Sequence, residues 1–173
     1  MDLSRITVRP FKLTDAEDIL LWASDDRVTS NTRLNTCVTK EQAVALIEEC
    51  TVKPFKRSIC LDDRSIGMIW VNPWTGDDNF KADLGYAIGF NYWGKGIATK
   101  ALKIVLSQVF HVFPCLKRLQ SFTLVENKAS QRVLQKAGFQ REGVLRKFFY
   151  FKGSFQDFLV HSFLSTDKIP PLD

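Results

Sequence analysis

The segment 81–112 constrains the fold of this chain more than any other part of the sequence. Residues 81–90 form a strand-like run, and in residues 96–112 apolar side chains recur at helical spacing. The loop between them contains two glycines, Gly94 and Gly96. A strand that passes through such a loop into a helix leaves backbone N–H groups unpaired at the helix N-terminus, where the helix dipole adds partial positive charge. The segment therefore predicts an anion-binding junction followed by a long buried helix.

Two common phosphate-binding loops do not fit this junction. A Walker loop requires Ser or Thr directly after its Gly-Lys pair, but here Gly96 follows Lys95. A Rossmann loop requires a third Gly or Ala where this chain has Thr99. It also requires an acidic residue about 20 residues further on, where this chain has Lys117 and Arg118. We therefore expect a phosphate-binding loop of another kind.

The N-terminal part predicts one strand and two helices. Residues 6–11 read as the strand, and each helix begins with a capping box. Thr14 and Glu17 form the first box, and Thr39 and Gln42 form the second. The polar residues between the two helices predict a surface loop.

The remaining elements alternate between strand and helix periodicity. Two runs flank the tight turn at Asp62 and Asp63 and predict a β-hairpin, which residues 81–90 extend to an antiparallel meander. The last two strands form a second hairpin that turns at Lys152 and Gly153. The strands of the first hairpin are expected at residues 57–61 and 65–72, and those of the second at 143–151 and 155–164. Between the two hairpins we expect a further strand at residues 116–125 and the last helix at 127–139.

The order of elements is β-α-α-β-β-β-α-β-α-β-β, without repeats or a low-complexity linker. This order predicts an α+β (mixed α/β) fold in a single domain, residues 1–173, in which the long helix joins two parallel neighbouring strands. A chain of 173 residues that is 45% hydrophobic is large enough for one substantial core.

Composition narrows the function classes. The net charge is +5 with a pI of about 9.1, but charges of both signs are mixed along the chain, so we expect an anionic ligand and no direct nucleic-acid binding. The four cysteines lack metal-site spacing, so we expect no metal and a reduced, intracellular protein. No stretch approaches the ~18 apolar residues of a membrane span. The expected location is the cytoplasm, with the nucleus left open.

The glycine loop also matches the pyrophosphate loop of acyl-CoA-dependent N-acyltransferases, Arg/Gln-x-x-Gly-x-Gly/Ala, from Gly94 onward, with Trp93 in front of it. The whole chain resembles the GNAT superfamily of N-acetyltransferases. The resemblance is carried, in the family's order, by VRPFKLTDAEDI, DLGYAIGFNYWGKGIATKAL, VENKASQRVLQKAGFQREGVLR and FQDFLVHSF. More narrowly, the chain is similar to the branch that contains the bacterial ribosomal-protein alanine N-acetyltransferases, in which a YWGKG loop is common.

This resemblance implies a GNAT-like fold, with a mixed, mostly antiparallel twisted sheet of about seven strands flanked by about four helices. It implies an acetyl-CoA-dependent N-acetyltransferase that needs no metal. The acetyl group would pass from acetyl-CoA to a primary amine, by direct attack on the thioester in a ternary complex. The acceptor would be a peptide or protein N-terminus or a small-molecule amine, and the enzyme a monomer or homodimer.

The resemblance also assigns the cofactor-binding residues. The strand before the loop should carry a bulge at Gly85 and Gly89 and diverge from its parallel neighbour. The resulting V-shaped slot would take the pantetheine arm, which the backbone of Ile88 and the side chain of Asn127 would bind. The cofactor-binding residues of the loop and the first helical turn would be Trp93, Gly94, Lys95, Gly96, Ile97, Ala98 and Thr99.

Two residues are expected to be catalytic. Asp83 would accept the proton of the incoming ammonium, although a role as a solvated strand residue or a structural hydrogen-bond acceptor stays open. Ser130, one helical turn after Asn127, would hydrogen-bond the departing sulfur. Many relatives place a tyrosine one turn further on as general acid, but this chain has Leu134 there, so Ser130 or water must serve.

A second departure lies in the strand after EGVLR, where the ribosomal-protein branch can carry a glutamate base. This chain has Lys147 to Tyr150 there. Tyr150 stays open as a site residue, but an aromatic side chain in a strand favours a place in the core. The missing tyrosine and glutamate leave one alternative, a catalytically weak or silent acyl-CoA-binding module that acts in regulation or interaction. The acceptor would be recognised by residues 27–37, 70–74 and 148–155. Because these lack an acidic cluster, they favour a peptide N-terminus or a neutral small amine over a polyamine.

Overall fold

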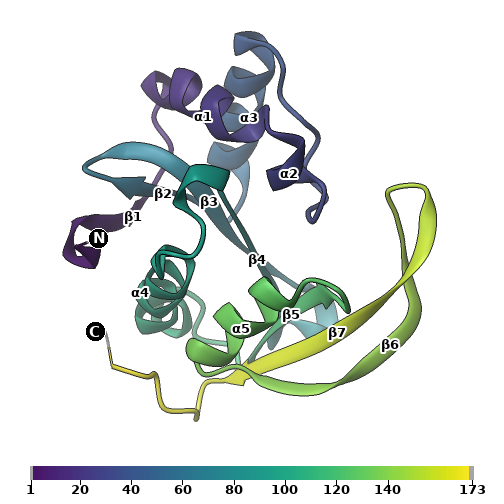
Figure 1. Cartoon of the computed structure of the whole chain (residues 1–173). Coiled ribbons are helices and arrows are strands. Elements are labelled where there is room, and N and C mark those ends of the chain that lie inside the picture. Colours follow the sequence, from purple (N-terminus) through teal and green to yellow (C-terminus); the bar gives the residue numbers. More distant parts are fainter. Residues whose placement is uncertain (1, 172–173) are drawn as a thin grey trace.

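The computed structural model describes residues 2–171, which form one sheet with helices on both faces (Figure 1). The strands are β1 (Ile6–Arg9), β2 (Phe55–Leu61), β3 (Arg64–Pro73), β4 (Lys81–Ile88), β5 (Arg118–Leu124), β6 (Gln140–Phe151) and β7 (Ser154–Leu164). The helices are α1 (Ala16–Ala23), α2 (Asp26–Thr29), α3 (Lys40–Val52), α4 (Ile97–Val112) and α5 (Lys128–Lys136). Short 3-10 turns lie at Leu3–Arg5, Leu13–Asp15, Gly76–Asp78 and Phe90–Tyr92.

The strands are arranged in the order β1-β2-β3-β4-β5-β7-β6. Neighbouring strands run antiparallel except for β4 and β5, which are parallel and are joined by α4. The mixed, mostly antiparallel sheet and the crossover helix are therefore confirmed. Both hairpin turns are confirmed as well, with left-handed backbone at Asp62, Asp63, Lys152 and Gly153.

The parallel pair β4 and β5 separates soon after it begins. The two strands pair only from Lys81 to Asp83, opposite Arg118 to Gln120. Beyond this point β4 stays paired with β3, and β5 stays paired with β7, each in unbroken register. The expected divergence of β4 from its neighbour is thus present. The expected bulge at Gly85 and Gly89 is wrong, because β4 runs without a register shift against β3.

Apolar side chains cover both faces of the sheet. On one face α4 and α5 bury Leu102, Leu106 and Leu134 against the strands. On the other face α1 and α3 bury Ile19 and Ile47. Each such side chain contributes about 1.5–3 kcal/mol when it is fully removed from water. The two halves of the sheet are therefore held by the helices even where β4 and β5 no longer touch.

The first capping box, expected at Thr14 and Glu17, is wrong. A 3-10 turn precedes α1, and the carboxylate of Asp15 accepts the backbone N–H of Lys12 at 2.8 Å. Thr14 does not cap the helix, since the cap position of α1 is Asp15 itself. The Asp15 side chain makes no cap hydrogen bond to α1, because its carboxylate is engaged by the N–H of Lys12 and by a cationic partner, described below.

The second helix begins as predicted. The hydroxyl of Thr39 accepts the N–H of Gln42 at 3.3 Å, and the Gln42 side chain accepts the N–H of Thr39 at 3.2 Å. The segment before it, predicted as a surface loop, contains the single-turn helix α2. This turn is capped by Asp25, whose carboxylate accepts the N–H of Arg27 at 2.9 Å.

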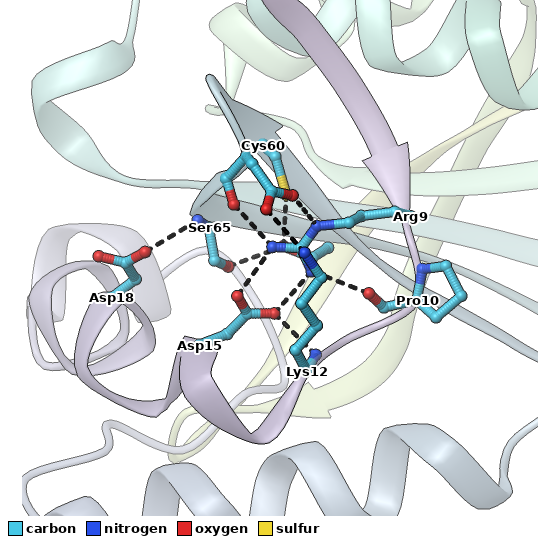
Figure 2. Close-up of polar contacts among 9 residues, drawn as sticks. Arg9, Pro10, Lys12, Asp15, Asp18, Cys60 and Ser65 are labelled. Atoms are coloured by element: carbon cyan, nitrogen blue, oxygen red, sulfur yellow. Dashed lines mark hydrogen bonds and ion pairs between the residues drawn. The ribbon is translucent and has the colours of Figure 1, made fainter.

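A polar network joins β1, the β2–β3 turn and α1 (Figure 2). Both terminal nitrogens of Arg9 donate to the carboxylate of Asp15, each at 2.8 Å, and one also donates to the carbonyl of Asp63 at 2.7 Å. In the next turn of the helix, Asp18 accepts the N–H of Ser65 at 3.1 Å. Asp15 is only 4% exposed, so its ion pair with Arg9 is a buried contact that fixes the start of α1 to β1 at the edge of the sheet.

We predict that Asp15→Asn lowers the free energy of unfolding at pH 7 by about 1–3 kcal/mol, because it removes the buried one of the two carboxylates that pair with Arg9 and leaves only the exposed Asp63. Burial raises the pKa of Asp15, but hydrogen bonds from Arg9 and Lys12 lower it by more, so the net pKa lies below the ordinary value of about 4. The stabilisation is therefore present above this value and declines as the pH falls through the folded-state pKa.

Urea unfolding at pH 7 and pH 3 measures this effect, and the difference between variant and wild type should be smaller at pH 3. The exposed Asp77 offers a matched control, because Asp77→Asn should change stability by less than about 0.5 kcal/mol at either pH. An Asp15→Asn protein as stable as the wild type at pH 7 would contradict the assignment.

Candidate functional site

A cavity of about 980 Å³ lies where β4 and β5 separate. Its walls come from β4, the loop before α4, the start of α5, the segment between α2 and α3, and the β6–β7 hairpin. All residues predicted for the site line this one cavity: Asp83, Ile88, Trp93, Gly94, Lys95, Gly96, Ile97, Ala98, Thr99, Asn127 and Ser130. The fold thus brings together residues from three separate parts of the sequence.

The loop before α4 forms a cradle of backbone N–H groups. Gly94 and Gly96 have φ angles of +73° and +79°, in the left-handed region where a side chain is strained. Gly96 is the cap residue of α4, and in the described part of the chain no side chain accepts a capping hydrogen bond from the first N–H groups of the helix. The first turn also contains no acidic residue. This helix N-terminus therefore matches the requirements of an anionic ligand.

The loop is fixed to the end of β4 by Trp93. Its indole N–H donates to the carbonyl of Ile88 at 2.7 Å, and its ring packs against Phe90 with centroids 5.1 Å apart. The ammonium of Lys95 is also turned to the loop itself, where it donates to the carbonyl of Asn91 at 2.8 Å. Trp93 and Lys95 therefore shape the cradle, and the carbonyl of Ile88 is already engaged.

The backbone of β4 faces the gap at every second residue. Gly89 donates its N–H to the carbonyl of Ile66, on the side of β3. Because the backbone groups of successive strand residues point to alternate sides, those of Ile88 and Tyr86 point away from β3, toward the gap. On that side β5 has already diverged. An extended ligand arm lying in the gap could pair with this strand edge, which agrees with the role expected for the N–H of Ile88.

One buried hydroxyl on the opposite wall also needs a partner. Thr123 of β5 is 4% exposed, lines the cavity, and its Oγ1 makes no hydrogen bond within residues 2–171. Buried hydroxyls are nearly always hydrogen-bonded in folded proteins. The orphaned hydroxyl and the glycine cradle both fit a polar, anionic ligand in this cavity.

Asp83 lies at the point where the two strands part. Its carboxylate accepts a hydrogen bond from the amide of Gln120, directly opposite on β5, at 2.9 Å. Within the described chain no cationic side chain pairs with it. Along β4, Asp83 points to the same face as Ala87, which packs with the α1 and α3 cluster.

Ser130 lies on the opposite face, at the start of α5. Its N–H donates to the Oδ1 of Asn127 at 3.1 Å, so Asn127 caps this helix as its sequence position indicates. The Ser130 hydroxyl is 2.7 Å from the phenol oxygen of Tyr86 on β4. Burial raises the pKa of Tyr86, which therefore stays protonated at neutral pH.

Sequence reasoning missed Tyr86 as a site residue. Its alternation along β4 placed it on one face of the strand, but no local pattern indicates that α5 packs against that face. Leu134, at the position where relatives place a tyrosine, is fully buried in the core and offers no polar atom.

The other end of the cavity is aromatic. The ring of Trp70 covers Gly85, where an added Cβ would lie only 2.2 Å from the Trp70 Cζ2 atom. Gly85 is therefore needed for this packing. The guanidinium of Arg33 lies 3.9 Å from the ring centroid of Phe149, and Lys152 at the tip of the β6–β7 hairpin donates to the carbonyl of Leu34 at 3.3 Å. The projecting hairpin thus reaches the segment between α2 and α3 (Figure 1).

Two polar residues of the β6–β7 hairpin, Tyr150 and Asp157, are not among the residues that line the cavity. Tyr150, expected in the core, is 67% exposed, because the β6–β7 hairpin extends beyond the helices and leaves its tip in solvent. Asp157 accepts the N–H of Lys147 at 2.7 Å, at a point where β6 shifts register and Lys147 has a φ of +48°. Asp157 therefore stabilises a kink in the hairpin.

Neither metal nor membrane features accompany this cavity. Among residues 2–171, no group of three His, Cys, Asp or Glu side chains is arranged to hold a metal ion. None of the helices in this range has the length and apolar composition needed to cross a membrane.

Comparison with known proteins relates this chain to N-acetyltransferases, both by a family model and by individual relatives. A sequence model of the family described as "Acetyltransferase (GNAT) domain" matches residues 5–140. The chain is 31% identical over 169 residues to YoaA, an uncharacterized N-acetyltransferase of Bacillus subtilis, with 94% of each chain covered.

Two solved structures are similar in fold. The ribosomal-protein-S5-alanine acetyltransferase of Vibrio fischeri has a TM-score of 0.79 at 22% identity, with 98% of each chain covered. The microcin C7 self-immunity acetyltransferase MccE, solved with acetyl-CoA and AMP, has a TM-score of 0.79 at 25% identity, with 92% of each chain covered.

We predict that Gly94→Glu weakens acetyl-CoA binding at least about tenfold, since it places a carboxylate in the anion cradle. Gly76→Glu is a matched control. Both glycines have positive φ angles, +73° and +65°, and at both positions a Cβ would meet no atom within 4 Å. Both variants thus carry similar backbone strain, but Gly76 lies outside the cavity.

Isothermal titration calorimetry with acetyl-CoA measures the effect, and Gly76→Glu should change the Kd less than about twofold. Equal affinity of the Gly94→Glu variant and the wild type would show that the loop does not hold the anion.

Proposed function

This chain belongs to the GNAT acetyltransferase family, and we propose that it transfers the acetyl group of acetyl-CoA to a primary amine by direct attack on the thioester in a ternary complex. The observation that carries the proposal is the single cavity that holds an anion cradle, a carboxylate and a hydroxyl pair around the gap between β4 and β5. We further propose that residues 1–173 act as one N-acetyltransferase domain in the cytoplasm, as a monomer or homodimer.

The residues of the cavity suit acetyl-CoA. The amides from Gly94 to Ala98 would hold the pyrophosphate at the N-terminus of α4. The N–H of Ile88 and the hydroxyl of Thr123 would contact the pantetheine arm. When bound, acetyl-CoA supplies a thioester that is already activated for attack, so the protein's tasks are to orient the amine and to stabilise charge.

Asp83 is the proposed base. Its carboxylate is oriented by Gln120, lines the cavity and has no cationic partner among residues 2–171, so it is available to accept the proton of an ammonium. The other carboxylate on the cavity wall, Glu49, already pairs with Lys56 at 2.7 Å.

Ser130 is the proposed donor to the departing sulfur. A thiol has a pKa near 8.5, whereas a serine hydroxyl is a much weaker acid. Ser130 would therefore stabilise the negative charge on sulfur by donating a hydrogen bond, and the thiolate would take its proton from solvent.

The acceptor is proposed to be a peptide or protein N-terminus or a small-molecule amine. The acceptor end of the cavity is aromatic, with Trp70 and Phe149. Within residues 2–171, Arg33 at this end makes no ion pair, and no cluster of acidic residues lines the wall. Such a wall is unfavourable for a polyamine. The fold shared with the Vibrio fischeri enzyme makes a peptide with N-terminal alanine a natural first acceptor to test.

The test is thiol release from acetyl-CoA across a panel of amines: peptides with N-terminal alanine or serine, free amino acids, aminoacyl nucleotides and polyamines. We expect release above the hydrolysis background with a peptide or a small amine, and an acetylated product by mass spectrometry. Tight acetyl-CoA binding without release for any amine would instead support the silent binding module.

We predict that Asp83→Asn lowers kcat by about 10²-fold, in keeping with the loss of a positioned general base, while the Kd for acetyl-CoA changes less than about twofold. Asparagine keeps the size of the side chain and a hydrogen bond to Gln120. The exposed Asp77→Asn serves as the control, and steady-state kinetics with the best acceptor measures both. Unchanged kcat in Asp83→Asn would assign Asp83 a structural role.

A further inference from the structure

We propose that Tyr86 is a positioning residue, whose phenol holds the hydroxyl of Ser130 toward the departing sulfur. The inference rests on the proposed function, because it concerns the leaving-group side of the same reaction. It assigns to a strand residue part of the task that many relatives give to a tyrosine on the helix.

The geometry brings the two hydroxyl groups together from different elements. Tyr86 lies on β4, at a point where pairing with β5 has ended, and Ser130 lies in the first turn of α5. Their oxygens are 2.7 Å apart, and the phenol oxygen is also 3.3 Å from the Ser130 carbonyl. Both residues line the cavity.

The direction of the hydrogen bond decides what Ser130 can do. Serine carries one proton and two acceptor positions, and near a helix N-terminus its hydroxyl readily turns to a backbone carbonyl of its own helix. When the phenol donates to the Ser130 Oγ, one acceptor position is filled and the serine proton points away from Tyr86. The phenol is suited to donate to the Oγ, because it is the more acidic of the two hydroxyls and because the Oγ, at 2.7 Å, lies nearer to it than the Ser130 carbonyl, at 3.3 Å.

The position of Tyr86 matches the side of the gap where sulfur would lie. Tyr86 lies on the same face of β4 as Leu84 and Ile88, which belong to the apolar cluster under α4 and α5. Asp83 points to the opposite face, toward the α1 and α3 cluster. The proposed base and the hydroxyl pair therefore stand on different sides of β4, so that the incoming amine and the departing sulfur would each have a separate polar partner.

The step is balanced without a further reagent. The amine nitrogen bonds to the carbonyl carbon, the carbon–sulfur bond breaks, and sulfur takes the electron pair. The nitrogen loses two protons: one from the ammonium before attack, which Asp83 takes and releases to solvent, and one after attack, which Asp83 or water takes. The thiolate accepts a hydrogen bond from Ser130, while Tyr86 keeps its own proton because a phenol, with a pKa near 10, is a weaker acid than a thiol.

The experiment compares Tyr86→Phe, Ser130→Ala and the double variant. Phenylalanine keeps the ring packing and removes only the phenol oxygen. We expect Tyr86→Phe to lower kcat about five- to twentyfold, with the KM and Kd for acetyl-CoA changed less than about twofold. Ser107→Ala, which removes an exposed helical hydroxyl outside the cavity, is the matched control and should keep wild-type kinetics.

The double variant separates positioning from a structural role. If Tyr86 acts through Ser130, the double variant should be no slower than Ser130→Ala within about twofold. Multiplicative losses, or a kcat of Tyr86→Phe equal to that of the wild type, would overturn the inference while leaving the proposed function intact. A wild-type protein that acetylates no amine would overturn both. Urea unfolding of each variant checks that the losses in kcat do not arise from reduced stability.

Discussion

The early separation of β4 from β5 is the physical feature on which the rest of the structure depends. Leaving buried backbone groups without partners costs about 1–3 kcal/mol each, so neighbouring strands normally stay paired along their length. Here three residue pairs hold the strands at one end, and each strand is then held only by its outer neighbour. The gap exposes a strand edge inside the sheet, and a ligand with backbone-like polar groups is its natural partner.

The surrounding packing keeps this gap open. Helices cover both faces, and the apolar cluster under α4 and α5 contains side chains from both halves of the sheet, such as Ile59 of β2 and Leu119 of β5. This shared cluster holds the two halves in place where β4 and β5 no longer touch. The indole of Trp93 fixes the glycine loop to the end of β4, and the ring of Trp70 covers Gly85 on the other face. The cavity is thus built into the folded chain, with its cradle already formed.

In the proposed reaction the two faces of β4 have different tasks. Asp83 and the aromatic wall near Trp70 lie on the face of α1 and α3, where the amine would enter. Tyr86 and Ser130 lie on the face of α4 and α5, where the thiolate would leave. The alternation of side chains along one strand is enough to keep a proton acceptor and a hydrogen-bond donor apart, so that neither neutralises the other.

The sequence by itself determined the order of the elements, the second capping box, both hairpin turns and the glycine junction, because these depend on contacts between residues close in the chain. It also indicated Asp83, Ser130 and the loop from Trp93 to Thr99 through the resemblance. Only the tertiary structure decided three contacts: the Asp15 carboxylate pairs with Arg9 instead of capping α1, the ring of Trp70 packs on Gly85, where no bulge forms, and the phenol of Tyr86 lies within hydrogen-bond distance of the Ser130 hydroxyl. Each of these contacts joins residues from different elements, and no local periodicity records which distant element will pack against a given face.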